Sequence, residues 1–300
     1  MDWLGQHGTL GAAGPGTPRG ARRRAVLAAG GIAAGTLGLG ITACRLLGRQ
    51  TARLEQGEEV PSVLTIYTFG DSILDCGRYN AHGITPGALL VRNDDRLFPE
   101  LRGQDLATLV PRLPVRLEHR ARDGATVDDL PAQARGIPGP RRREPAGAPA
   151  GAGSDGDERG IALLTVGGND LLRGLILDTG PGIEAFAEAL DAAVAHLTGE
   201  LGIRPVLIGN VYDPTFGDDA RNFLGVDPRV ARTNHRRMNA ALAQVAGRYG
   251  ELVDLHRHFL AGDPSWYTAT IEPSLRGASE VRRAFWPRVA AVASALAAPA

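Results

Sequence analysis

Residues Val63–Phe69 read Val-Leu-Thr-Ile-Tyr-Thr-Phe, and Gly70, Asp71 and Ser72 follow them directly. The run consists mainly of apolar, β-branched and aromatic residues and stops at a glycine, which is typical of a β-strand. Strands with such continuous apolar sequences are expected where helices cover both faces of a parallel sheet. The stretch therefore predicts a buried strand that ends in a polar turn.

Four further runs have the character of short strands, and they recur along the chain. They are Val115–His119, Ile161–Val166, Pro205–Ile208 and Leu252–Leu255. Amphipathic stretches separate them, and strand–helix alternation of this kind implies helices packed on both faces of one sheet. The sequence thus predicts an α/β fold: a three-layer α/β/α sandwich with a five-stranded, mainly parallel sheet of the flavodoxin-like type.

Three of the intervening stretches carry helix signals. Residues 183–201 place apolar side chains at helical spacing. Asp227 and Pro228 are typical of an N-cap and a first helical position, and they predict a helix that runs toward Gly250. A last helix is expected to begin within 277–285, and Pro287 is expected to interrupt or restart it.

The chain is expected to consist of an N-terminal targeting segment over residues 1–60 and a folded domain over residues 61–300. Arg22–Arg24 precede an uncharged, Ala/Gly-rich run over 25–43, an order typical of export signals and similar to a twin-arginine signal. The run ends at Cys44 in Ile-Thr-Ala-Cys, which resembles a bacterial lipobox. An uncleaved helix over 25–43 is the alternative, because about 20 apolar residues span a bilayer.

We therefore expect an exported, extracytoplasmic protein that touches a membrane through this segment only, as a lipoprotein or through a helix. Within the folded domain, the Pro/Gly/Ala-rich residues 136–160 are expected to form a disordered insertion. Such a composition offers too little apolar surface to bury.

Composition excludes several classes of protein. The 300 residues are 43% apolar, which is sufficient for one well-buried domain. Lys plus Arg and Asp plus Glu number 33 each, so no overall field favours nucleic acid. Two cysteines exclude a disulfide-stapled fold. We expect no cofactor and no metal, because the short cluster Asp254, His256 and His258 lacks a clear further partner.

The residues that follow the strands are polar and glycine-rich, and this is where open α/β sheets bind ligands. Ser72 follows the first strand, Gly124 the second, and Gly167-Gly168-Asn169-Asp170 the third. Each motif alone also fits a structural role, because Asp and Ser cap helices and a double glycine makes a tight turn. Their occurrence together, in order and after apolar strands, favours a catalytic site.

Phe69–Asp75 (FGDSILD) resembles the first conserved block of the GDSL/SGNH hydrolases, Gly124 the second-block glycine, and GGND at 167–170 the third block. The resemblance extends from about Pro61 to near the C-terminus. It implies that Ser72 attacks an ester or acyl carbonyl, and that the Ser72 N–H, the Gly124 N–H and the Asn169 amide form an oxyanion hole. A glycine at 124 is expected to allow close approach of the backbone.

The fourth block departs from the family. Family members carry Asp-x-x-His-Pro there, whereas this chain has Ala269 at the aspartate position and Glu272 before Pro273. A serine hydroxyl needs a proton acceptor, and a glutamate with a pKa of about 4.3 suits neutral pH less well than histidine unless burial raises its pKa. Glu272 is the expected base, and His256, His258 and His82 are the alternatives.

The sequence therefore predicts a serine ester hydrolase, an acyl or acetyl esterase or a lipase-like enzyme. Its expected substrate is a small-molecule ester or an acylated glycan or lipid, and no nucleic acid is expected as a partner. The alternative is a catalytically impaired binding module at the cell surface that keeps the oxyanion hole but lacks a working base.

Overall fold

The computed structural model describes residues 63–139 and 159–297. Five strands form one sheet in the order β2-β1-β3-β4-β5, and all four neighbouring pairs are parallel. The strands are β1 (Leu64–Gly70), β2 (Val115–His119), β3 (Arg159–Thr165), β4 (Val206–Gly209) and β5 (Gly250–Val253). The predicted five-stranded sheet is confirmed, with strand ends displaced by one or two residues.

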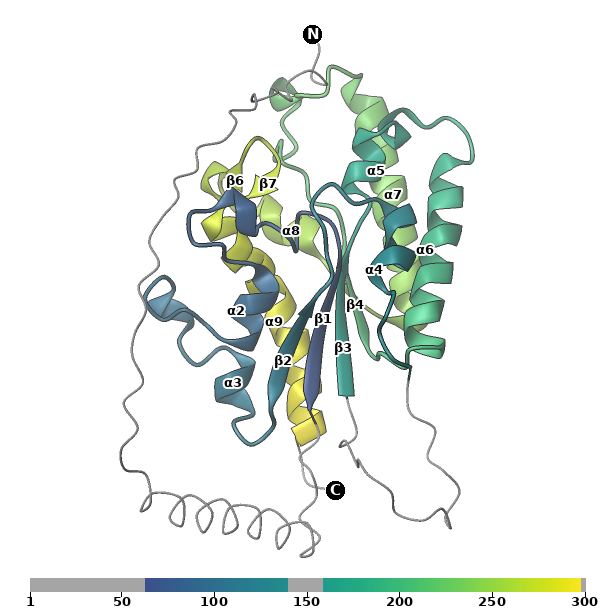
Figure 1. Cartoon of the computed structure of the whole chain (residues 1–300). Helices are drawn as coiled ribbons and strands as arrows, with labels where there is room; N and C mark the ends of the chain where they lie inside the picture. The colour runs from purple at the N-terminus through teal and green to yellow at the C-terminus, as the bar shows by residue number, and fades with distance from the viewer. Residues whose placement is uncertain (1–62, 140–158, 298–300) are drawn as a thin grey trace, which may run out of the picture. The chain divides into compact units, whose positions relative to one another are not determined.

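Helices cover both faces of the sheet, as predicted. Figure 1 shows α2, α3, α8 and α9 on one face and α4 to α7 on the other. Their bounds are α2 (Pro86–Val91), α3 (Leu106–Leu109), α4 (Leu130–Gln133), α5 (Gly168–Leu172), α6 (Gly182–Gly199), α7 (Pro228–Tyr249), α8 (Leu255–Leu260) and α9 (Leu275–Ala297). A hairpin of β6 (Tyr267–Thr268) and β7 (Glu272–Pro273) precedes α9.

Short 3-10 turns complete the connections. They are η1 (Gly77–Tyr79), η2 (Pro99–Leu101), η3 (Val127–Asp129), η4 (Leu175–Leu177), η5 (Asp219–Arg221) and η6 (Pro264–Trp266). Within the described ranges, no helix is both long and apolar enough to cross a bilayer. The expected export segment with Cys44, and most of the insertion expected at 136–160, lie outside the described residues.

The first strand supplies both cores because its side chains alternate between the two faces of the sheet. Tyr67 and Phe69 join the cluster under α6 and α7, while Leu64 and Ile66 join the cluster under α9. Burial of each such side chain contributes about 1.5–3 kcal/mol. The apolar continuity of β1 therefore reflects its place inside a two-sided core.

The last helix differs from the prediction, because α9 runs unbroken through Pro287. A proline in a helix interior costs about 3 kcal/mol by removing one hydrogen bond and crowding the preceding turn. Here Pro287 is exposed, so water can hydrate the carbonyl that it leaves unpaired. Phe285 and Val289, on either side of it in the sequence, are fully buried, and their packing offsets the cost.

The carboxyl ends of β1 and β3 are tied together closely. Gly70 has φ +105°, and a Cβ at this position would lie 1.6 Å from the carbonyl oxygen of Thr165, so only glycine fits. The Asp71 N–H donates to that same oxygen at 3.0 Å. The carboxamide of Gln133 accepts from the Gly70 N–H at 2.6 Å and donates to the Gly70 carbonyl at 2.8 Å. These bonds determine where the chain leaves the sheet.

The Asp71 side chain lies buried in this junction. Its Oδ1 accepts from the Thr165 hydroxyl at 2.8 Å and from the Ile73 N–H at 3.2 Å. Burial nevertheless raises the pKa of Asp71 from 3.8 to about 7, because the two hydrogen bonds only partly offset desolvation and the carboxyls of Glu272 and Asp170 lie nearby. At acidic to neutral pH the folded protein therefore holds a proton on Asp71.

We expect this proton to make stability depend on pH. Between pH 4 and 7 the folded state binds a proton on Asp71 that the unfolded chain releases. The contribution of this proton to the free energy of unfolding is therefore complete below pH 4 and is lost as pH rises through about 7. At about 1.4 kcal/mol per pKa unit, the loss amounts to roughly 4 kcal/mol. Asp71→Asn should remove it, which urea unfolding of both proteins from pH 4.5 to 7.5 would measure. Parallel curves for the two proteins would contradict the assignment.

Candidate active site

Ser72 lies in the turn that ends β1, and its side chain is almost buried, with 8% exposed. The turn is closed by the Asp75 N–H, which donates to the Asp71 carbonyl at 3.0 Å. The chain then passes into the 3-10 turn η1 at Gly77, so Ser72 lies in a turn and not in a helix. The hydrogen bonds of Asp71 described above hold the turn in place.

The loop after β2, which contains Gly124, is held by residues of and just after α5. The Asn169 amide donates to the Ala125 carbonyl at 2.9 Å, and Arg173 donates to the Gly124 carbonyl at 2.8 Å. Asp170 accepts from the Val127 N–H at 3.2 Å. The residues that follow β3 thus position the loop that contains Gly124, and they bring Gly124 close to Asn169.

Three hydrogen-bond donors remain available at this edge of the sheet. Neither the Ser72 N–H nor the Gly124 N–H has a hydrogen-bond partner among the described residues. The Asn169 side-chain nitrogen carries two hydrogens, and one of them is used by Ala125. Gly124 has φ +77°, and a Cβ there would contact nothing within 4 Å. The left-handed backbone accounts for glycine at this position, and the close approach of its N–H to a bound oxygen stays a prediction.

Glu272 is brought to Ser72 by the β6–β7 hairpin, whose loop is strained. Ala269 (φ 45°) and Thr270 (φ 74°) both adopt left-handed backbone, which costs L-residues roughly 1–2 kcal/mol each. The hairpin is anchored where the Tyr212 hydroxyl donates to the Ile271 carbonyl at 2.7 Å. At Gly277 in α9, a Cβ would lie 2.0 Å from the Trp266 carbonyl oxygen, so the two backbone segments can lie this close only because residue 277 is glycine. Strain maintained by surrounding contacts is common at functional sites.

The Glu272 carboxyl is largely buried, with 9% of the residue exposed. Burial raises its pKa above the ordinary value, and the nearby charge of Asp123 adds to the effect. The nearby hydroxyls of Ser72 and Tyr79 and the charge of Arg78 act in the opposite direction. The Glu272 Oε2 atom is buried without a hydrogen-bond partner among the described residues. The Glu272 carboxyl therefore lies near the Ser72 hydroxyl and has spare capacity to accept a hydrogen bond.

A polar network that sequence reasoning missed extends from Glu272 toward the surface. The Tyr79 hydroxyl donates to Asp123 Oδ2 at 2.9 Å, and Arg78 pairs with the same oxygen at 2.9 Å. The Asp123 N–H in turn donates to Asp75 at 2.9 Å. These residues lie in loops without periodicity, and their only sequence signal is their nearness to Ser72 and Gly124.

The structure places the alternative bases elsewhere. His82 is exposed, and His258 Nε2 lies 3.0 Å from a carboxylate oxygen of Glu280. The ring of His256 packs against that of His235, with centroids 5.0 Å apart. Within the described residues, no hydrogen bond joins Ser72 to any of these histidines or to Glu272, and Glu272 is the group whose pKa the Ser72 hydroxyl affects.

Cys76, one turn beyond Ser72 in the sequence, is buried in the core. Burial raises the pKa of its thiol to about 12, so the reactive thiolate is suppressed at neutral pH. Ser72 remains the accessible candidate nucleophile of this turn.

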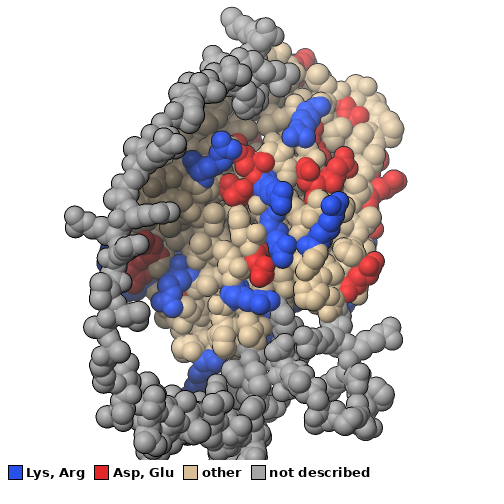
Figure 2. Space-filling view, in the orientation of Figure 1, with Lys and Arg blue, Asp and Glu red and all other residues tan. Residues whose placement is uncertain are grey.

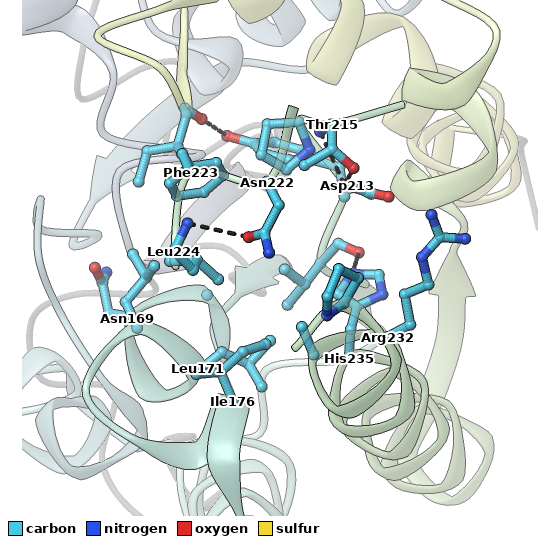
Figure 3. Close-up of a pocket in the computed structure, with 18 of the residues that line it drawn as sticks. Asn169, Leu171, Ile176, Asp213, Thr215, Asn222, Phe223, Leu224, Arg232 and His235 are labelled. Atoms are coloured by element: carbon cyan, nitrogen blue, oxygen red, sulfur yellow. Dashed lines mark hydrogen bonds between the residues drawn. The ribbon is translucent and has the colours of Figure 1, made fainter. Parts of the chain in front are cut away.

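A pocket opens beside Ser72 and Asn169 (Figure 3). Residues from the loops after β1, β3 and β4 and from the start of α7 line it. His235 of α7 is one of them, and its Nε2 lies 2.9 Å from the Val211 carbonyl oxygen. Burial, together with the nearby His256, lowers the pKa of His235 and favours its neutral form.

The visible surface carries no dominant charge. Figure 2 shows acidic and basic side chains interspersed over this face, in keeping with the equal numbers of acidic and basic residues in the chain.

Comparison with known proteins identifies the family of this chain and the proteins that share its fold. The model of the GDSL-like Lipase/Acylhydrolase family matches residues 68–278. An acetylxylan esterase from Geobacillus stearothermophilus is 18% identical, with a TM-score of 0.50 over 77% of this chain and 96% of that one. A Parabacteroides merdae protein described as a GDSL-like lipase is 14% identical, with a TM-score of 0.51 over 78% and 98%.

No curated protein matches the sequence significantly. At such identities the solved structures show a shared fold. The family model spans most of the sheet, the turn with Ser72, the Asn169 motif and the hairpin with Glu272. The chain belongs to the GDSL-like lipase/acylhydrolase family.

Proposed function

We propose that this member of an esterase family is a serine ester hydrolase in which Ser72 is the nucleophile and Glu272 the base. Membership in the family supports an ester hydrolase in general. The observation that carries the finer proposal is the buried Glu272 carboxyl, which lies near the Ser72 hydroxyl and keeps one oxygen without a hydrogen-bond partner among the described residues, at the edge of the sheet where three hydrogen-bond donors remain available. Nucleophile and proton acceptor within hydrogen-bonding reach are the minimal requirement of this chemistry.

In the proposed reaction, Ser72 Oγ forms a bond to the acyl carbon while its proton passes to ionised Glu272. The carbonyl oxygen becomes negatively charged and accepts hydrogen bonds from the Ser72 and Gly124 N–H groups and the Asn169 amide. The tetrahedral intermediate collapses, and the alcohol leaves with the proton from Glu272. Water then attacks the acyl-serine with Glu272 again accepting the proton, which releases the acid and restores Ser72.

Burial makes a glutamate suitable for this role. An ordinary carboxylate is a weak base at neutral pH, and general-base catalysis improves as the pKa approaches the working pH. Burial moves the pKa of Glu272 in that direction, whereas the hydroxyls of Ser72 and Tyr79 keep part of the ionised form available. The microenvironment thus substitutes in part for the imidazole of the family.

The proposed substrate is an ester of a small molecule or an acylated glycan or lipid outside the cytoplasm. One structural neighbour is named an acetylxylan esterase, which motivates acylated glycans. Export and membrane attachment through residues 1–60 belong to the proposal on the strength of the sequence pattern. The equal numbers of acidic and basic residues favour a neutral substrate.

A second function, binding without turnover, is favoured by one observation. Ala269 occupies the position of the family's aspartate, so no carboxylate there orients the base. The Tyr79 hydroxyl lies near Glu272, but it donates its hydrogen to Asp123. If a tyrosine hydroxyl orients the base too weakly, the site retains its oxyanion donors without catalysing hydrolysis.

A fluorophosphonate probe distinguishes the two functions. The proposed enzyme should be labelled by the probe and should hydrolyse p-nitrophenyl acetate, and Ser72→Ala should abolish both signals. Asn169→Ala should lower kcat by about 100-fold or more, since one oxyanion donor contributes on this scale. Thermal unfolding checks that each variant is folded. Folded wild-type protein without labelling or hydrolysis would establish the binding function instead.

The pH profile tests the base. Because Glu272 must be ionised to accept the proton, kcat/KM should fall at acidic pH. The inflection should lie at a pH above the ordinary pKa of a glutamate. Glu272→Gln should lower kcat by about 100-fold to 10,000-fold. The double variant Ala269→Asp with Glu272→His restores the family residues and should move the inflection to about 6.5. An unchanged rate in Glu272→Gln would remove Glu272 from the mechanism.

Two substitutions in the network should move that inflection in opposite directions. The Tyr79 hydroxyl lowers the pKa of Glu272, so Tyr79→Phe should shift the acidic inflection to higher pH. The Asp123 charge raises the pKa of Glu272, so Asp123→Asn should shift it to lower pH. Both should leave the alkaline plateau of kcat/KM within a few-fold of wild type. Shifts in the same direction, or none, would show that the network does not act on the base.

A further inference from the structure

The pocket beside the candidate site has an apolar side. Figure 3 shows Leu171, Ile176, Leu224 and Phe223 gathered on the side where Asn169 lies. Ser72 lines the same pocket, so its apolar wall is continuous with the candidate nucleophile and with one proposed oxyanion donor. A group attached to the carbonyl carbon that Ser72 attacks would therefore have apolar side chains within reach.

Two large side chains of this wall remain exposed to solvent. Leu172 is 38% exposed and Phe223 43% exposed, and both line the pocket. Single exposed apolar residues are ordinary, but apolar side chains gathered at one concave site indicate a surface that a ligand covers. Their burial by an apolar ligand would be favourable at about 25 cal/mol per Å².

The opposite side of the pocket is polar, yet its charged groups are already paired. Figure 3 shows Asp213, Arg232 and His235 on this side. Arg232 pairs with Asp219, and Asp213 accepts from the Thr215 hydroxyl at 2.6 Å. These groups present no unpaired cation to an anionic substrate, and they end the apolar wall. An uncharged aliphatic group is the occupant that fits between the apolar wall and this polar boundary.

We infer that the pocket binds the acyl chain of the ester, and that the chain is longer than acetyl. The inference rests on the proposed function, because the reacting carbonyl must lie at Ser72 and Asn169 for its chain to enter the pocket. An acetyl group has a single methyl and would leave Leu172 and Phe223 uncovered. The inferred acyl group is therefore longer than the one for which the acetylxylan esterase neighbour is named.

The test is the chain-length dependence of kcat/KM for p-nitrophenyl acetate, butyrate, hexanoate and octanoate below their micelle concentrations. Each methylene that enters the pocket should increase kcat/KM by up to about fourfold, until the polar boundary ends the gain. Ala231→Phe fills the pocket from α7 and should remove the gain, which the ratio of kcat/KM for hexanoate to kcat/KM for acetate measures in each variant. Val230→Phe, one residue earlier and exposed, does not line the pocket and serves as the matched control.

A binding measurement separates this inference from the proposed function. Ser72→Ala protein is titrated calorimetrically with hexanamide and acetamide, which are uncharged analogues of the ester. Hexanamide should bind at least about tenfold more tightly, and adding Ala231→Phe should remove the difference. Tight hexanamide binding without ester hydrolysis supports the pocket and overturns the enzyme. Ser72-dependent acetate hydrolysis with no gain for longer chains supports the enzyme and overturns the inference.

Discussion

The close approach of β1 and β3 at Gly70 is the constraint on which the site depends. A side chain at this position would overlap the Thr165 carbonyl, so glycine lets the two strands end side by side. The turn with Ser72 and the turn with Asn169 then leave the sheet at adjacent points. The Gln133 carboxamide and the buried Asp71 hold this junction from two sides. Without it, Ser72 and Asn169 would not line the same pocket.

The remaining parts of the site are positioned by contacts between segments distant in sequence. The loop with Gly124 depends on α5, and the hairpin with Glu272 depends on the Tyr212 hydroxyl. Two consecutive left-handed residues in that hairpin, one of them the β-branched Thr270, indicate that tertiary contacts outweigh local preference. The same enclosure that holds Glu272 also raises its pKa, so the fold both positions the proposed base and increases its basicity.

Much of the fold followed from local sequence because hydrophobic periodicity and cap residues act within a few positions of the chain. The five strands were located to within a few residues, and Asp227 caps α7 as predicted. The predicted interruption of the last helix at Pro287 was wrong, because burial of the neighbouring side chains in the core offsets the cost of a proline inside a helix. The positive φ angle that favours glycine at position 124 was not predicted from the sequence.

By itself the sequence determined the family, the order of the strands along the chain and the candidate residues Ser72, Gly124, Asn169 and Glu272, because motifs placed after apolar strands can be recognised locally. Only the tertiary structure decided that Glu272, Tyr79 and Asp123 lie close together near Ser72. It also decided the apolar pocket, which is built from four separate segments. Such contacts depend on how loops that are distant in the sequence pack together, and local sequence patterns do not predict this packing.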